Sequence, residues 1–374
     1  MKKILLRLMF LAMLVALLPV HVAQACSAFI VGKDLTADGS TLFGRTEDYP
    51  YAPDGGRHNK NYVVVPAKTY KEGDKLEDES NGFSYPHLAS EMKYTAVYDS
   101  DRGNGSNGDF AAHGFNEAGV SMTATVSATP NDKVLEQDPL VEDGLAEAAM
   151  VDLALPRSKT AREVIENVAK VIEEKGSAEG NIIVAADKNE LWYMEILSGH
   201  QYVAIKFPTN KYAVFANTYY LGHVDLNDKE NVIASKDVEE VAKKADNYKT
   251  DKDGNFMIAK SYGPDEYMER NRSRTYAGIK WMDPQAKVNY DDEAFDLLRE
   301  PTDPNKKYTV HDVIAEQRDR FETLPQYKAD DLVEVGKKID GNVYKYALGN
   351  ENVIDAHVYQ IKPNLPNAFG GVMW

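Results

Sequence analysis

Short apolar segments along the chain predict an antiparallel β protein with a few helices. Four strand-like runs follow one another with only short turns between them, over residues 182–186, 191–196, 201–206 and 212–216. Strands joined so closely pair antiparallel, because a parallel connection needs a crossover of about a dozen residues. A hairpin is predicted nearer the amino end, with strands over Ser27–Gly32 and Thr41–Arg45 and a turn at Ala37–Ser40.

Two segments show the apolar period of a helix instead. One runs over Thr160–Lys175, with Thr160 and Glu163 as a capping box and Gly176 as the stop. Its apolar face comprises Ala161, Val164, Ile165, Val168 and Ile172. A second helix is predicted from Thr309, where Val310, Val313 and Ile314 begin an apolar stripe.

The first twenty-five residues have the pattern of an export signal rather than of folded structure. Lys2, Lys3 and Arg7 precede an apolar run over residues 8–18, and Ala23 and Ala25 supply the small residues of a cleavage site. The apolar run is about half of what a helix needs to span a bilayer, so a retained membrane anchor is disfavoured. We therefore expect a signal peptide over residues 1–25, with cleavage between Ala25 and Cys26.

Composition narrows the function classes. The chain has 374 residues, 43% of them hydrophobic, and 43 basic against 59 acidic side chains give a net charge of −16. Loss of the three basic residues of the signal would leave −19. This globular, acidic composition argues against a nucleic-acid partner, since phosphate-binding surfaces need clustered Lys and Arg.

The single cysteine excludes a disulfide framework, a cysteine-rich zinc site and a thiol pair. Cleavage after Ala25 would make Cys26 the first residue, with a free α-amine beside its thiol. The thiol is a latent nucleophile of pKa about 8.5, and an α-amine of pKa about 8 can act as its base. Two other interpretations remain open: a lipid-modified cysteine of a surface lipoprotein, and an inert structural thiol.

The predicted hairpin brings Arg45 and Asp48 next to Cys26. An arginine beside a thiol favours the thiolate, and a carboxylate beside an α-amine can orient it. Taken alone, this arginine-x-x-aspartate pattern is also compatible with an exposed ion pair at a strand end.

Several blocks jointly resemble the dipeptidase A family, which is related to secernins and more distantly to bile salt hydrolases and penicillin V acylases. The blocks are Cys26–Phe29, Gly44–Asp48, Gly114–Val120 with Ala124 and Thr125, Leu191–Ile196 with Ser198–His200, Ala216–Thr218, Ser273–Thr275 and His357–Trp374. The resemblance implies an α+β fold: one N-terminal nucleophile hydrolase domain over residues 26–374, an αββα sandwich of two stacked antiparallel sheets flanked by helices. Family members usually continue beyond the point that Trp374 matches, which predicts a C-terminally truncated chain.

The same resemblance assigns roles to individual residues. Cys26 would be the nucleophile, flanked by Arg45 and Asp48. Asn217 would direct its amide at the oxyanion, and Arg274 would help to order the nucleophile. The relatives' second oxyanion asparagine falls near Thr125 or Ser127, where a hydroxyl or backbone N–H would replace it.

Other motifs have structural interpretations. Asn116–Gly119 is predicted as a hairpin turn, Trp192 and Tyr193 as core, and Asn217 could alternatively end its strand in a turn. Asp99–Asp109 and Asp251–Asn255 are predicted as surface loops. The second begins like a calcium loop but lacks the glycine and the glutamate that such a loop needs. The seven histidines after the signal are scattered and no H-E-x-x-H occurs, so neither a zinc peptidase nor a cofactor is predicted.

These observations predict an exported cysteine-type dipeptidase located outside the cell, at its surface or in a periplasm. An acylase acting on N-acyl amides, of the bile salt or penicillin V type, is the alternative within hydrolases. A lipid-anchored surface binding protein is the alternative outside them. The expected partner is a dipeptide or other small amide, with no nucleic acid and no membrane span after processing; a homo-oligomer is left open.

Overall fold

The computed structural model describes residues 26–49, 59–99, 110–322, 324, 345–369 and 371–374. The predicted signal peptide, including Ala25, and most of the polar stretch Asp99–Asp109 lie outside these residues. Within the described part of the chain, no helix is both long and apolar enough to cross a membrane.

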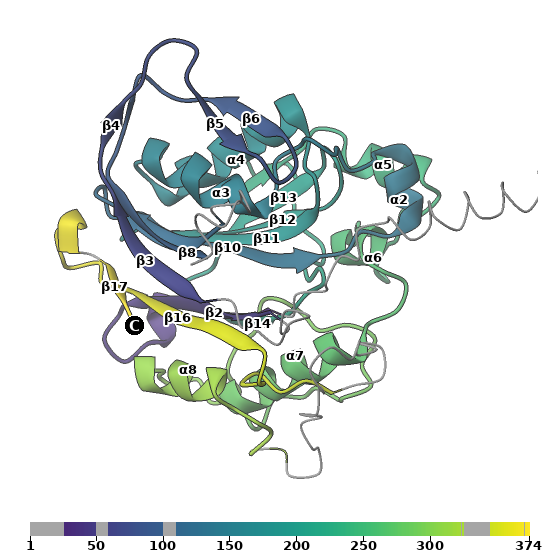
Figure 1. Ribbon diagram of the computed structural model, residues 1–374. Helices are drawn as coiled ribbons and strands as arrows, with labels where there is room; N and C mark the ends of the chain where they lie inside the picture. Colours follow the sequence, from purple (N-terminus) through teal and green to yellow (C-terminus); the bar gives the residue numbers. More distant parts are fainter. Residues whose placement is uncertain (1–25, 50–58, 100–109, 323, 325–344, 370) are drawn as a thin grey trace, which may run out of the picture.

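Two antiparallel sheets form the middle of the molecule (Figure 1). The smaller sheet has the order β14 (Tyr212–Phe215), β1 (Ser27–Val31), β2 (Thr41–Asp48), β16 (Val353–Ile361), β17 (Gly371–Met373). The larger has the order β15 (Val232–Ala234), β13 (Tyr202–Lys206), β12 (Leu191–Ile196), β11 (Gly180–Ala186), β10 (Ser121–Ala128), β9 (Ala111–Asn116), β8 (Tyr94–Asp99), β3 (Lys60–Val65). Two further two-stranded sheets pair β4 (Lys68–Thr69) with β7 (Ser90–Glu91) and, within the segment between them, β5 (Lys75–Asp78) with β6 (Phe83–Pro86).

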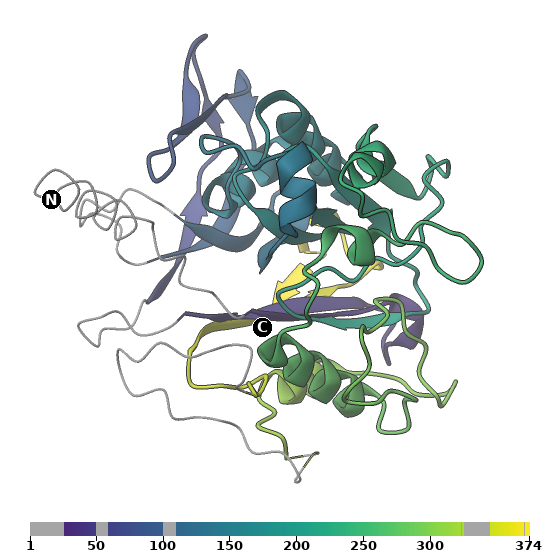
Figure 2. The same cartoon turned by 90° about the vertical axis from the view of Figure 1, so that its right-hand side faces the viewer.

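Helices cover the outer faces of both sheets. On the larger sheet lie α3 (Glu147–Ala154) and α4 (Ala161–Lys175), and on the smaller sheet lie α7 (Glu269–Met282) and α8 (Val310–Gln317). Figure 2 shows the resulting order of layers, helices, sheet, sheet, helices. The shorter helices are α2 (Asp132–Gln137), α5 (Val238–Lys244) and α6 (Ile258–Tyr262). The predicted αββα sandwich is confirmed.

Strand alternation divides the core into two layers. On β12, Tyr193 packs between the two sheets, whereas its neighbour Trp192 packs under α3 and α4. Successive side chains of a strand point to opposite faces, so a strand covered on both sides is apolar throughout. Both residues are fully buried, which confirms their prediction as core.

The local signals locate both helices, but the predicted capping box of Thr160 and Glu163 is only half formed. Thr160 caps α4 by accepting from the backbone N–H of Glu163, although the Glu163 carboxylate accepts from Lys159 rather than from Thr160. Gly176 ends the helix with a φ of 78°, a conformation that glycine adopts without steric cost. Thr309 and Asp312 form a complete capping box at α8.

Pairing of β16 with β2 brings the two ends of the described chain together. His357 lies opposite Arg45 in this ladder, and Asp355 lies opposite Glu47. The register shifts between Val353 and Asp355, a bulge that increases local twist. A segment more than 300 residues away in sequence thus completes the surroundings of β2.

Candidate active site

Cys26 lies immediately before β1 and is fully buried. Arg45 pairs with Ala28 on the neighbouring strand, and its Nη1 donates to Cys26 Sγ at 3.4 Å. The short predicted hairpin therefore brings the guanidinium of Arg45 into direct contact with the thiol.

The surroundings hold this thiol in its neutral form. Burial raises the pKa of Cys26 to about 12, and the contribution of Arg45, which lowers it, is smaller. The carboxylates of Glu47, Asp48 and Glu147 raise this pKa further. In the chain where Cys26 still follows Ala25, the thiol is therefore protonated at neutral pH.

Glu47 anchors the arginine that touches the thiol. Its Oε2 accepts from Arg45 Nη2 at 2.8 Å, and its Oε1 accepts from Lys60 Nζ at 2.6 Å. Lys60 also pairs with Asp99 at 2.7 Å. Because Glu47 is buried, these charges compensate one another away from water.

Asp48 is also buried, at the end of β2. Its Oδ2 accepts from Asn350 Nδ2 at 2.6 Å and lies 4.0 Å from Arg274 Nη1. Burial nevertheless raises the pKa of Asp48 to about 7, because it outweighs the lowering by Arg274 and Asn350. This carboxyl can therefore exchange a proton near neutral pH.

Arg274 holds the backbone of the nucleophile from α7. Its Nη1 donates to the carbonyl oxygen of Cys26 and, at 3.1 Å, to Ser27 Oγ. Its Nη2 donates to Asn217 Oδ1 at 2.8 Å and to Asn271 Oδ1 at 2.9 Å. One guanidinium thus connects Cys26, the strand after it and the predicted oxyanion residue.

Asn217 follows β14 and bridges the two sheets. Its Nδ2 donates to the carbonyl oxygen of Ser127 on β10 at 2.9 Å. A primary amide carries two N–H bonds, and the second is the one that could serve a substrate oxygen. The turn and the catalytic interpretations of Asn217 are compatible, since the residue ends its strand and also contacts Arg274.

The two hydroxyl candidates lie at an irregular part of β10. Pairing with β11 passes from Ala124 directly to Val126, so Thr125 is the extra residue of a bulge. Ser127 donates its hydroxyl to Glu147 Oε2 at 3.0 Å. Bulges often lie beside active sites, where they redirect side chains.

Several contributors to this site escaped the sequence prediction. Glu47 lies inside the block Gly44–Asp48, and its position two residues after Arg45 on one strand face could have revealed it. Asn271 lies three residues before Arg274 on α7, so the helical spacing from Arg274 could have revealed it. Asn350 and Glu147 reach the site only through long-range packing, and no local pattern marks them.

Two predicted structural motifs behave as expected. Asn116 Oδ1 accepts from the backbone N–H groups of Ala118 and Val120, and this turn connects β9 to β10. Asp251 Oδ1 likewise accepts from the N–H groups of Asp253 and Asn255 in an exposed loop.

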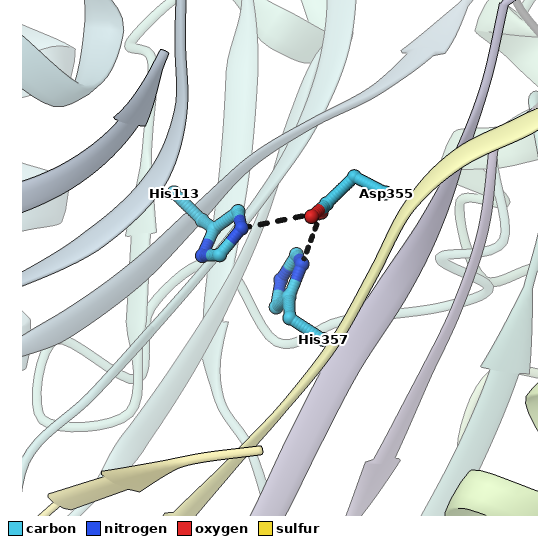
Figure 3. Close-up of side chains that lie close together, drawn as sticks. All are labelled: His113, Asp355 and His357. Carbon is cyan, nitrogen blue, oxygen red and sulfur yellow. Dashed lines mark hydrogen bonds and ion pairs between the residues drawn. The ribbon is translucent and has the colours of Figure 1, made fainter. Parts of the chain in front are cut away.

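A second polar cluster lies between the sheets, formed by His113, Asp355 and His357 (Figure 3). Asp355 Oδ2 lies 3.2 Å from His113 Nε2 and 2.9 Å from His357 Nδ1. The remaining ring nitrogens lie 2.9 Å from the Tyr359 hydroxyl and 3.1 Å from the Thr123 hydroxyl. Histidines scattered along the sequence are therefore brought together by the fold.

This cluster has the donor types of a zinc site, two imidazoles and a carboxylate. Its rings, however, stack 3.5 Å apart with an interplanar angle of 17°, and both nitrogens point at the same carboxylate oxygen. A metal ion bound to both nitrogens would have to take the place of that oxygen, so binding would require the carboxylate to move. Burial lowers the pKa of His357 to about 3, which keeps this imidazole neutral. The observed arrangement is a hydrogen-bonded link between the sheets.

Comparisons with known proteins place this geometry in context. The sequence model of peptidase family C69 matches residues 25–374. Probable dipeptidase B of Streptococcus pyogenes serotype M1 is 51% identical over 94% of this chain and 69% of its own length. A probable dipeptidase of Latilactobacillus sakei is 31% identical over 94% of this chain and 71% of its own length. Probable dipeptidase A of S. pyogenes serotype M3 (strain SSI-1) is 28% identical over 94% of this chain and 73% of its own length.

Proposed function

The chain belongs to peptidase family C69, and we propose that it is an exported dipeptidase with Cys26 as its nucleophile. The relatives' names support dipeptides as substrates. The observation that carries the cysteine mechanism is that two arginines contact Cys26. Arg45 donates to the sulfur of Cys26, and Arg274 donates to its carbonyl oxygen.

Removal of residues 1–25 would activate the site. Cys26 would gain an α-amine with a pKa of about 8, which can accept the thiol proton at neutral pH. The resulting α-ammonium, together with Arg45, would favour the thiolate that the uncut chain disfavours. Asp48 would lie where a carboxyl can orient this amine.

Hydrolysis would then proceed in two stages. The thiolate attacks the carbonyl carbon of the peptide, and the oxyanion accepts a hydrogen bond from the amide of Asn217. The carbon–nitrogen bond breaks as the α-ammonium gives its proton to the leaving amine, which leaves a thioester on Cys26. Water then gives a proton to the α-amine, attacks the thioester and releases the thiolate and the second product.

Two measurements test this proposal. Amino-terminal sequencing and intact mass of the exported protein should show a free Cys26, whereas a diacylglyceryl mass increment would support the lipid-anchor alternative. A panel of dipeptides tested beside N-acyl amides should show hydrolysis of the dipeptides; turnover of the acyl amides alone would instead support an acylase.

Substitution of the nucleophile tests the chemistry itself. Cys26→Ala should abolish dipeptide hydrolysis while the circular dichroism spectrum is retained, since the reacting sulfur is absent. Cys26→Ser should leave at most weak activity, because a hydroxyl ionises far less readily than a thiol. Dipeptide hydrolysis by the alanine variant would refute the mechanism.

A further inference from the structure

A carboxylate from the larger-sheet side of the molecule reaches the proposed oxyanion region. Glu147 is the first residue of α3, and its side chain is buried, with 8% exposed. Its Oε2 accepts from Ser127 Oγ at 3.0 Å, and the Ser127 carbonyl accepts from Asn217 Nδ2 at 2.9 Å. Ser127 therefore contacts both the carboxylate of Glu147 and the amide of Asn217, which is proposed to bind the oxyanion.

The charge of Glu147 opposes the nucleophile. It raises the pKa of the Cys26 thiol, as Glu47 and Asp48 also do. Those two residues adjoin Arg45 on β2 and lie close to arginines that hold the nucleophile. Glu147 also raises the pKa of Arg45 and so supports its charge. It belongs to a different element, however, and it approaches from the side of Ser127 and Asn217.

Substrate chemistry gives a further role to a carboxylate in this place. In a dipeptide with a free amino end, a single carbon atom separates the ammonium nitrogen from the scissile carbonyl. When that carbonyl oxygen contacts Asn217, the ammonium must lie within a few ångströms of it. A buried carboxylate in this region can bind the ammonium through charge-assisted hydrogen bonds, which are stronger than neutral ones.

We propose that Glu147 binds the α-ammonium group of the substrate and so directs hydrolysis to the peptide bond of a free amino-terminal residue. This assignment rests on the proposed dipeptidase function and deepens it. Substrates whose amino group is acylated lack the positive charge and should be hydrolysed poorly.

The test compares one dipeptide with its Nα-acetyl derivative, using the processed enzyme. Wild type should hydrolyse the free dipeptide with the higher kcat/KM. Glu147→Gln keeps the side-chain shape and an oxygen for Ser127 but removes the charge, so this preference should fall about 10- to 100-fold, mainly through KM for the free dipeptide. Glu147→Asp should retain part of the preference.

Glu179→Gln is the matched control, because Glu179 accepts the backbone N–H of Glu147 at 2.7 Å and carries the same charge nearby. It should leave the preference unchanged. A folded Glu147→Gln enzyme that keeps the wild-type preference would overturn the assignment of Glu147 alone. A wild type that hydrolyses neither compound would overturn the dipeptidase function and this assignment together.

A measurement on wild type keeps the proposal testable even if the glutamine variant does not fold. The preference for the free dipeptide should decline as the substrate ammonium loses its proton, around pH 8. The acetylated compound has no such group and corrects for titration of the enzyme. A preference that stays constant through this range would contradict ammonium binding by Glu147.

Discussion

At the scale of single residues, Asn217 combines several contacts that fix its position. Its side chain accepts from Arg274 and donates to Ser127, and its backbone carbonyl accepts from Asn271. An oxyanion donor must be held in place before charge develops, because its value lies in costing no reorganisation during the reaction. The contacts of Asn217 satisfy this requirement.

Replacement of Asn217 should therefore affect the chemical step more than substrate binding. Asn217→Ala should lower kcat about 100-fold or more, with a smaller change in KM, when dipeptide hydrolysis is measured under saturating and limiting substrate. Asn217→Asp is the matched variant, since it keeps an oxygen that can accept from Arg274 but has no N–H for the oxyanion. It should lose kcat as the alanine variant does, and a retained kcat would indicate that Asn217 only supports Arg274.

The sequence reveals these residues unevenly. Arg45 lies on the hairpin that begins at Cys26, so local pairing alone brings it to the thiol. Asn217 and Arg274 could be assigned only through the family resemblance. Asn350 contacts Asp48 across about 300 residues of chain, and nothing near Asn350 in the sequence marks that contact.

At the scale of elements, a buried carboxylate fixes the segment that follows β14. Glu195 lies on β12, and its Oε1 accepts from the Tyr193 hydroxyl and from the backbone N–H groups of Tyr220 and Leu221. The loop that carries Asn217 is thereby tied to the larger sheet. Burial raises the pKa of Glu195 to about 7, although these hydrogen bonds lower it.

This pKa has a consequence for stability. Between pH 4.5 and 7 the native protein retains a proton that the unfolded chain releases, so the contribution of Glu195 to stability declines as pH rises. The loss amounts to at most about 3 kcal/mol over this range. In denaturant unfolding at several pH values, Glu195→Gln should show a flatter decline, because the amide does not titrate.

The surface variant Glu166→Gln should reproduce the wild-type pH dependence, since Glu166 lies on the exposed face of α4, where it pairs with Arg162. An unchanged slope in the Glu195→Gln protein would mean that Glu195 is already ionised in the native state at low pH.

Apolar periodicity predicted the continuous elements well. The strand over Leu191–Ile196 was predicted with the bounds that β12 has, and the two capped helices were located correctly. β9 is predicted only without bounds, as the apolar strand before the turn at Asn116–Gly119, and β16 is not predicted from periodicity. Both strands carry a polar side chain inward: His113 on β9 and His357 on β16. Their burial depends on a partner in the opposite sheet, which no local pattern encodes.

At the scale of the whole molecule, this inward-facing cluster joins the two layers of the sandwich. His113 belongs to the larger sheet, and Asp355 and His357 belong to the smaller one (Figure 3). Burial raises the pKa of Asp355, but the two histidines beside it lower this pKa to well below the ordinary value. Asp355 is therefore ionised. A shared acceptor between two layers should couple them energetically.

We expect this coupling to be measurable as a double-mutant cycle. Asp355→Ala leaves two buried imidazoles without their carboxylate and should destabilise the protein by about 2–4 kcal/mol. His113→Ala combined with Asp355→Ala should lose less than the sum of the single losses, by about 1–3 kcal/mol. Unfolding of each variant in denaturant measures these values, and the exposed His311→Ala should change stability by less than about 0.5 kcal/mol. Additive losses would show that the sheets are held together independently of this link.

The same cluster predicts the response to a metal ion. Addition of Zn²⁺ in a Cys26→Ala background, where no thiol competes, should leave the melting temperature unchanged, because the Asp355 carboxylate oxygen occupies the point at which both imidazole nitrogens are directed. A rise that disappears in Asp355→Ala would instead identify the cluster as a metal site.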